Sequence, residues 1–108
     1  MSNEQKIWDS LKSRGLNDFA VAGIMGNLLA ESGLRADNLQ NSYEKKLGMS
    51  DAEYTAAVDS GSYDNFVNDK AGYGLAQWTY YSRKQALLNY CKAYGGSIGS
   101  LDMQLGFL

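Results

Sequence analysis

The acidic side chain of Glu31 is the strongest candidate for chemistry in this sequence. It directly follows the apolar run FAVAGIMGNLLA, residues 19–30, and precedes Ser32 and Gly33. We expect a carboxyl at the end of an apolar helix to resist ionisation, because burial disfavours the charged form and the helix end adds a smaller effect. A carboxyl that keeps its proton near neutral pH can act as a general acid. The alternatives are that Glu31 reaches solvent beyond the helix end, or pairs with Arg35 four residues later.

Other catalytic chemistries lack their residues. The 108-residue chain has no histidine and a single cysteine, Cys91. These absences exclude an internal disulfide, Cys/His zinc sites, and catalysis by Ser-His-Asp or Cys-His groups. We therefore expect no metal and no cofactor, and any catalysis must come from Asp, Glu, Tyr, Lys or backbone groups. Ten basic and twelve acidic residues give a net charge of −2, without the positive clusters that nucleic acids or anionic membranes require.

The segment AGYGLAQWTYYSR, residues 71–83, is the candidate ligand-binding surface. It contains an amide, an indole and three phenols: Gln77, Trp78, Tyr73, Tyr80 and Tyr81. Sugar rings present flat C–H faces and many hydroxyls, so aromatic platforms beside amide donors and acceptors suit them. The alternative is that Trp78 and Tyr80 are core aromatics and that Gln77 caps a helix.

Helices separated by glycine-rich loops must position these residues. A capping box at 2–5 opens a helix that ends at Gly15, and a second helix runs from Asn17 to Ser32 with Gly33 as its stop. Every face of the second helix is apolar or glycine, so we expect it to be central, with Gly23 and Gly26 allowing close approach of neighbours. Capping signals at 50–53 and 82–85 open two more helices, and residues 60–81 read as loops or a small hairpin.

The ends of the chain add two expectations. The N-terminus lacks the apolar core of a signal peptide, and residues 19–30 are too short to span a bilayer. The apolar segment LDMQLGFL, residues 101–108, should form another helix and pack against the domain's own helices or a second copy. At 108 residues the chain suits one domain, 1–108, and its ending suggests a C-terminally truncated core.

The segments AGIMGNLLAESGLRADNLQNSYEKKLG and AGYGLAQWTYYSRKQALL resemble the phage tail-associated lysozymes. The nearest pattern is the cell-wall-degrading domain on the tail knob of Bacillus-infecting short-tailed phages. Goose-type lysozymes and soluble lytic transglycosylases are similar more distantly. The resemblance runs from Ile7 onward and implies an α+β, mainly α, lysozyme-like fold with a small β element. It also implies cleavage of the β-1,4 bond between N-acetylmuramic acid and N-acetylglucosamine, on the phage tail or at the cell-wall face. Partners would be peptidoglycan strands and other tail proteins, without nucleic acid or membrane insertion.

The resemblance also implies roles for particular residues. Glu31 would be the catalytic acid, the Gly-x-x-Gln motif would fall on Gly74 and Gln77, and Trp78 would adjoin the glycan cleft. Glycosidases usually use two carboxyl groups. The candidates for the second are the loop aspartates Asp59, Asp64 and Asp69.

The transglycosylase-like enzymes manage with one carboxyl by using the substrate's own hydroxyl or acetamido group, so hydrolysis and transglycosylation both stay open. Two alternatives from other classes are a non-catalytic peptidoglycan-binding module and a structural domain of a phage tail assembly.

Overall fold

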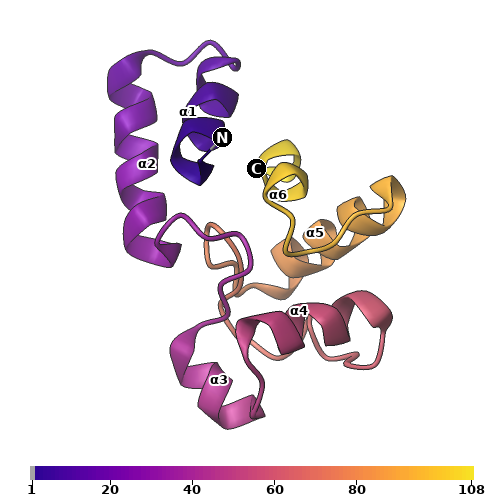
Figure 1. Cartoon of the computed structure of the whole chain (residues 1–108). Helices are drawn as coiled ribbons and strands as arrows, with labels where there is room; N and C mark the ends of the chain where they lie inside the picture. Colours follow the sequence, from indigo (N-terminus) through magenta and orange to yellow (C-terminus); the bar gives the residue numbers. More distant parts are fainter. Residues whose placement is uncertain (1) are drawn as a thin grey trace.

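A computed structural model describes residues 2–108, which form six helices joined by loops (Figure 1). The helices are α1 (Asn3–Lys12), α2 (Asp18–Ser32), α3 (Asn41–Leu47), α4 (Asp51–Ser60), α5 (Tyr81–Tyr94) and α6 (Leu101–Phe107). Helix α1 packs against α2, and α6 packs against both α1 and α5. The chain is elongated, 40 × 29 × 26 Å, with α3 and α4 at the end opposite α1 and α2.

Local capping chemistry explains where several of these helices begin and end. The Ser50 hydroxyl accepts from the Glu53 backbone N–H while the Glu53 carboxylate accepts from the Ser50 N–H, a complete capping box. The Asn17 side chain accepts from the Ala20 N–H at the start of α2. Gly33 ends α2 in the left-handed conformation, at φ 64°, where glycine carries no steric penalty. These boundaries agree with the prediction from sequence.

Two apolar clusters make up the core, and the loop at residues 72–79 joins them. One cluster lies among α1, α2 and α6, and its buried residues are Ile7, Leu11, Val21, Leu28, Leu75 and Leu105. The other is largely aromatic and includes Tyr54, Phe66, Tyr73, Trp78, Leu87 and Ile98. Ala76 and Leu108 pack against both clusters. The same loop therefore contributes to both halves of the interior.

Helix α2 is not central, which corrects the expectation from its composition. It buries one stripe, Val21, Leu28 and Ser32, while Phe19 on the opposite face is 91% exposed. A Cβ added at Gly23 or Gly26 would meet nothing within 4 Å, so neither glycine supports a close helix contact. Figure 1 shows α2 along the outer edge of the molecule. Composition reports that a helix is apolar but not how much of it other elements cover.

The small β element is also absent as a sheet within residues 2–108. Tyr73 forms two isolated antiparallel bridges, with Leu39 and with Trp78. Helix α3 was not predicted: its N-cap Gln40 makes no side-chain capping bond, so the usual start signal is missing. The fold is mainly helical and compatible with a lysozyme-like domain.

The apolar segment at the C-terminal end forms α6 and is packed, as predicted. Leu105 is buried in the cluster with α1 and α2, and the Phe107 ring meets the Trp78 ring edge-on with centroids 5.5 Å apart. Arg14 donates to the carbonyl oxygens of Leu105 and Leu108. None of the helices formed by residues 2–108 is long and apolar enough to cross a bilayer.

Candidate active site

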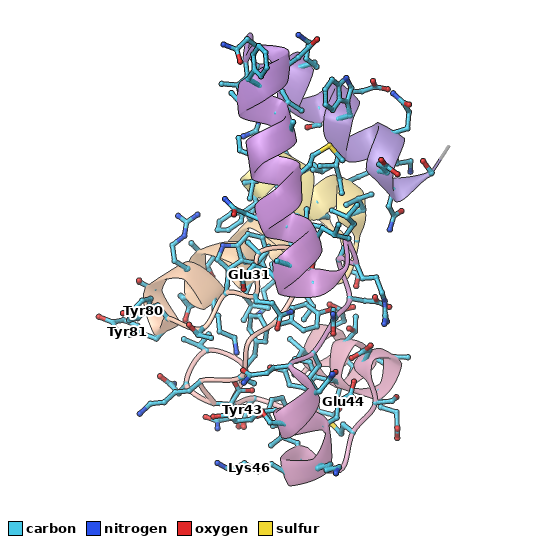
Figure 2. All side chains as sticks on the ribbon, turned by 90° about the vertical axis from the view of Figure 1, so that its left-hand side faces the viewer. Glu31, Tyr43, Glu44, Lys46, Tyr80 and Tyr81 are labelled. Atoms are coloured by element: carbon cyan, nitrogen blue, oxygen red, sulfur yellow. The ribbon has the colours of Figure 1, made fainter. Side chains whose placement is uncertain are left out.

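Glu31, Gln40 and Gln77 together line a hollow beside the last turn of α2. Two adjoining depressions of about 460 and 350 Å³ share these three side chains. The first extends to Gly72 and Thr79, and the second extends towards α3. Figure 2 shows Glu31 at the lower end of α2. The structure thus brings together Glu31 and Gln77, which lie 46 positions apart in the sequence.

Asn38 connects the helix that carries Glu31 to the loop that carries Gln77. Its side-chain amide donates to the carbonyl of Ser32, the residue after Glu31, at 2.9 Å. Its own backbone carbonyl accepts from the Gln77 Nε2 at 2.7 Å and from the Gly74 N–H at 2.9 Å. One residue therefore fixes both sides of the hollow, and such support is what holds a site in a productive geometry.

Gln40 and Gly72 line the hollow and are hydrogen-bonded to each other. The Gln40 N–H donates to the Gly72 carbonyl at 2.8 Å, and the Gly72 N–H donates to Gln40 Oε1 at 3.0 Å. A Cβ at Gly72 would lie 2.9 Å from Gln77 Oε1 and 3.1 Å from Gln40 Oε1. Any side chain at Gly72 would therefore displace the two amides that line the hollow.

Gly74 shapes the turn that leads to Gln77. Its φ of 85° is in the left-handed region, and an added Cβ would lie 2.9 Å from the Gln104 amide and 3.0 Å from the Trp78 ring. Gln104, on α6 and fully buried, accepts from the Leu75 N–H at 2.8 Å and donates to the carbonyl of Ala36 at 2.6 Å. Within the predicted Gly-x-x-Gln motif, Gly74 is thus a backbone-shaping residue, and Gln77 lines the hollow.

Glu31 itself is exposed, which corrects the expectation that it would be buried at the end of an apolar helix. It does not pair with Arg35 either. Arg35 Nη2 lies 2.6 Å from the Asp51 carboxylate and 3.2 Å from that of Asp37, and the Asp51 bond raises the pKa of Arg35. Of the two alternatives for Glu31, the structure supports the one in which its carboxyl faces solvent at the end of the helix.

Tyr73 and Trp78 lie in the core rather than on the ligand side. Tyr73 is fully buried, and its hydroxyl is hydrogen-bonded to Thr55 Oγ1. Trp78 is only 8% exposed and packs on Phe107. Both side chains contact the protein interior. Trp78 is therefore a core aromatic, as the alternative interpretation of the sequence stated. Burial of an aromatic residue in a glycine-rich loop depends on tertiary contacts that its local sequence does not contain.

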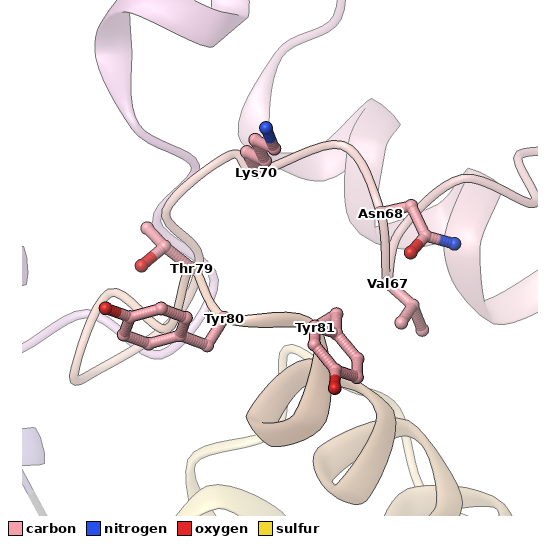
Figure 3. A pocket seen from close by; sticks show the side chains of 6 residues that line it. All are labelled: Val67, Asn68, Lys70, Thr79, Tyr80 and Tyr81. Carbon is pink, nitrogen blue, oxygen red and sulfur yellow. The ribbon is translucent and has the colours of Figure 1, made fainter.

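Tyr80 and Tyr81 face solvent beside a second hollow at the start of α5. Val67, Asn68, Lys70 and Thr79 complete its lining, and its volume is about 400 Å³ (Figure 3). The two tyrosines are 76% and 67% exposed. Thr79 lines both this hollow and the one beside Glu31, so the two adjoin. Tyr80 is therefore accessible to a ligand but lies next to the Glu31 hollow rather than in it.

Asp69 lies at the centre of a buried polar cluster. Its side chain is 3% exposed and accepts from the Tyr54 and Tyr63 hydroxyls at 2.7 Å each and from the Ala71 N–H at 2.9 Å. Lys84, whose side chain is fully buried, donates to Asp69 at 2.5 Å and to the Ala71 carbonyl at 2.8 Å. Burial lowers the pKa of Lys84, partly offset by Asp69, and burial together with the Asp69 bond raises the pKa of Tyr54 and of Tyr63.

The other two candidate aspartates lie outside the hollow as well. Asp59 accepts from the Ile98 N–H at 3.0 Å and from the Ser97 hydroxyl, so it ties α4 to the loop before α6. Asp64 is exposed in the loop after α4. Neither Asp59, Asp64 nor Asp69 is among the residues that line the depressions around Glu31. Among residues 2–108, no group of three or more acidic or cysteine side chains is arranged to hold a metal ion.

Sequence reasoning missed the amides that complete the hollow. Asn38 and Gln40 lie in the segment ADNLQNS, where polar residues read simply as a loop. Asn41 and Ser42, at the start of the unpredicted α3, extend the polar wall. The only available signal was that three amide side chains and one hydroxyl fall within the five positions 38–42, shortly after Glu31.

Comparison with known proteins gives one result. A family model described as phage tail lysozyme matches residues 2–108. No curated protein and no solved structure gives a significant match.

Proposed function

The chain belongs to the phage tail lysozyme family, and on that basis we propose that it cleaves the β-1,4 bond between N-acetylmuramic acid and N-acetylglucosamine, with Glu31 as general acid. Family membership itself suggests a lytic enzyme that acts on peptidoglycan, and a location in the virion tail. The bond and the catalytic residue are our proposal. The observation that carries it is the convergence of Glu31, Gln40 and Gln77 on one polar hollow.

The hollow has the groups that a glycan requires. The Glu31 carboxyl is exposed beside it, where a glycosidic oxygen can approach within hydrogen-bonding distance. Gln40, Asn38 and Ser42 supply amides and a hydroxyl for sugar hydroxyls and acetamido groups. Gln77 is held by Asn38, so its remaining carbonyl oxygen keeps a fixed direction towards Gly72.

A general acid must hold a proton when the bond breaks, and contact with water favours the charged form of a carboxyl. We propose that the substrate supplies the missing burial. A glycan lying in the hollow excludes water from Glu31, and a carboxyl that water does not reach favours its neutral form.

We propose no catalytic role for Asp59 or Asp69, because their carboxylates are already hydrogen-bonded elsewhere. Either water activated without a second carboxylate or the substrate's own acetamido or hydroxyl group then completes the reaction. Mass spectrometry of digested peptidoglycan distinguishes the two, since hydrolysis gives reducing ends and transglycosylation gives 1,6-anhydro ends.

The decisive variant is Glu31→Gln, which keeps the shape of the side chain but has no acidic proton. We expect cell-wall digestion to fall by about 10²–10⁴-fold, the usual contribution of a general acid, with binding to insoluble peptidoglycan retained. Glu4→Gln, at an exposed carboxylate on α1, is the matched control and should digest at the wild-type rate. Digestion by Glu31→Gln at that same rate would remove Glu31 from the mechanism.

A non-catalytic glycan-binding module is the second candidate, favoured by the exposure of Glu31 and the absence of the three aspartates from the hollow. That candidate requires the wild-type protein to sediment with peptidoglycan and to release no soluble fragments. A structural tail domain would not sediment with peptidoglycan and would also release no soluble fragments.

A further inference from the structure

We propose that the hollow at the start of α5 binds the peptide stem of peptidoglycan, next to the sugar over Glu31. This inference rests on the proposed function, because it assumes that a glycan strand lies in the Glu31 hollow. Its basis is the lining of the second hollow: two exposed phenol rings, one valine and one lysine, without any carboxylate (Figure 3).

The charge of this hollow is set by Lys70. Among residues 2–108, no acidic side chain forms an ion pair with Lys70, whereas the neighbouring cation Lys84 is bound by Asp69. A lysine over an otherwise neutral hollow attracts a carboxylate, and a charge-assisted hydrogen bond gives that contact strength. Sugar hydroxyls also accept hydrogen bonds from an ammonium group, but a carboxylate adds charge to that bond and gains more from this cation.

The remaining lining suits a short peptide with small side chains. The faces of Tyr80 and Tyr81, with Val67 beside them, offer apolar area for methyl groups. Asn68 adds an amide that can pair with a peptide bond. Peptidoglycan stems combine these features, because they carry small alanine side chains together with free carboxylates.

The backbone around Lys70 is fixed in advance of binding. Lys70 adopts a left-handed conformation, φ 63°, which is costly for a residue with a side chain. The residues on either side of Lys70 are joined, because the Asp69 carboxylate accepts from the Ala71 N–H. Lys84 also donates to both Asp69 and the Ala71 carbonyl. The buried cluster therefore presents Lys70 at a set position without using Lys70 itself.

The position of the hollow matches the covalent structure of the polymer. Thr79 lines both hollows, so they meet at this residue. In peptidoglycan, alternate sugars carry the peptide stem on a lactyl ether. A strand placed over Glu31 therefore projects its stem beside the sugar, and the hollow with Lys70 is the adjoining one.

The test compares two ligands and three variants in a Glu31→Gln background, which prevents turnover. The ligands are glycan strands freed of anionic wall polymers, either with their stem peptides or with the stems removed by an amidase. The lactyl carboxylates that the amidase leaves on the stripped strands are converted to methylamides, so that these strands carry no anion in place of the stem. We expect Lys70→Gln to weaken binding of stem-bearing strands by about five- to tenfold, the scale of one charge-assisted contact, and to leave stripped strands unaffected. Lys70→Arg keeps the charge and should keep the preference. Lys45→Gln, an exposed lysine on α3 that lines neither hollow, makes the same charge change elsewhere.

Three outcomes would overturn the proposal. They are an equal loss on both ligands, no loss on either, or loss of the preference in Lys70→Arg as well, which would assign the effect to loop geometry. Circular dichroism of each variant confirms that it is folded. The proposed function fails separately: the protein with Glu31 intact would then release no fragments from either ligand, whatever its preference between them.

Discussion

Removing the buried cation Lys84 should be among the most damaging single substitutions in this chain. In Lys84→Met the side chain keeps an unbranched apolar stem, one atom shorter, but loses its two hydrogen bonds, to Asp69 at 2.5 Å and to the Ala71 carbonyl at 2.8 Å. Asp69 would keep three donors but would be a buried charge without a counter-ion, because its side chain is 3% exposed. Leaving such a charge costs about 3–5 kcal/mol. A chain of this size has a free energy of unfolding of about 5–15 kcal/mol, so about a fifth or more of it would be lost.

Urea denaturation followed by circular dichroism measures this loss. With a urea dependence of about 2 kcal/mol per molar, the midpoint should fall by about 2 M. Lys12→Met is the matched control, because it removes an exposed ion pair to Asp18 at 2.8 Å, and such pairs contribute about 0–1 kcal/mol. Adding Asp69→Asn to Lys84→Met should recover part of the loss, since it removes the unpaired charge. The reasoning is refuted if Lys84→Met shifts the midpoint no more than Lys12→Met does.

Two further outcomes follow from the buried aromatics and the thiol. Trp78→Ala should lower the free energy of unfolding by about 3–5 kcal/mol, the cost of removing an indole ring from the core. Glycan affinity in the folded fraction should be unchanged. A stable variant with weakened affinity would instead place Trp78 in the ligand site. Burial raises the pKa of the Cys91 thiol to about 11 from an ordinary 9.0, and the pKa values of Tyr54 and Tyr63 are raised as well. The folded chain therefore keeps protons that the unfolded chain releases. Stability should therefore fall as pH rises from 9 towards 11. Lys84, whose pKa is lowered, opposes only part of this loss. Urea midpoints that rise across this range would contradict these pKa shifts.

The features that were predicted correctly depend on local chemistry. Ser50 and Glu53 satisfy each other's backbone groups within four residues, and Gly33 stops α2 because of its own conformational freedom. Glu31 could be placed on the last turn of a helix for the same reason. The family resemblance, carried by the segments around Glu31 and Gln77, agrees with the match over residues 2–108.

The features that were not predicted depend on contacts between distant segments. Phe19 lies in an apolar segment that suggests burial, yet it is exposed, and Trp78 lies in a glycine-rich loop that suggests exposure, yet it is buried. The reason is that α6 covers Trp78, whereas nothing in residues 2–108 covers Phe19 to the same degree. Asn38 acts on the site through its backbone carbonyl as much as through its side chain. A backbone contact of this kind leaves no trace in residue type.

The amide of Gln104 makes the order of synthesis relevant to the site. Its partners lie 68, 29 and 6 positions earlier in the chain, at Ala36, Leu75 and Ile98. The loop that carries Gln77 therefore cannot reach its final geometry on the ribosome until residue 104 has emerged and α6 has docked. Contacts this distant in sequence form late and slow folding. Glu31 thus leaves the ribosome well before the opposite wall of the hollow exists.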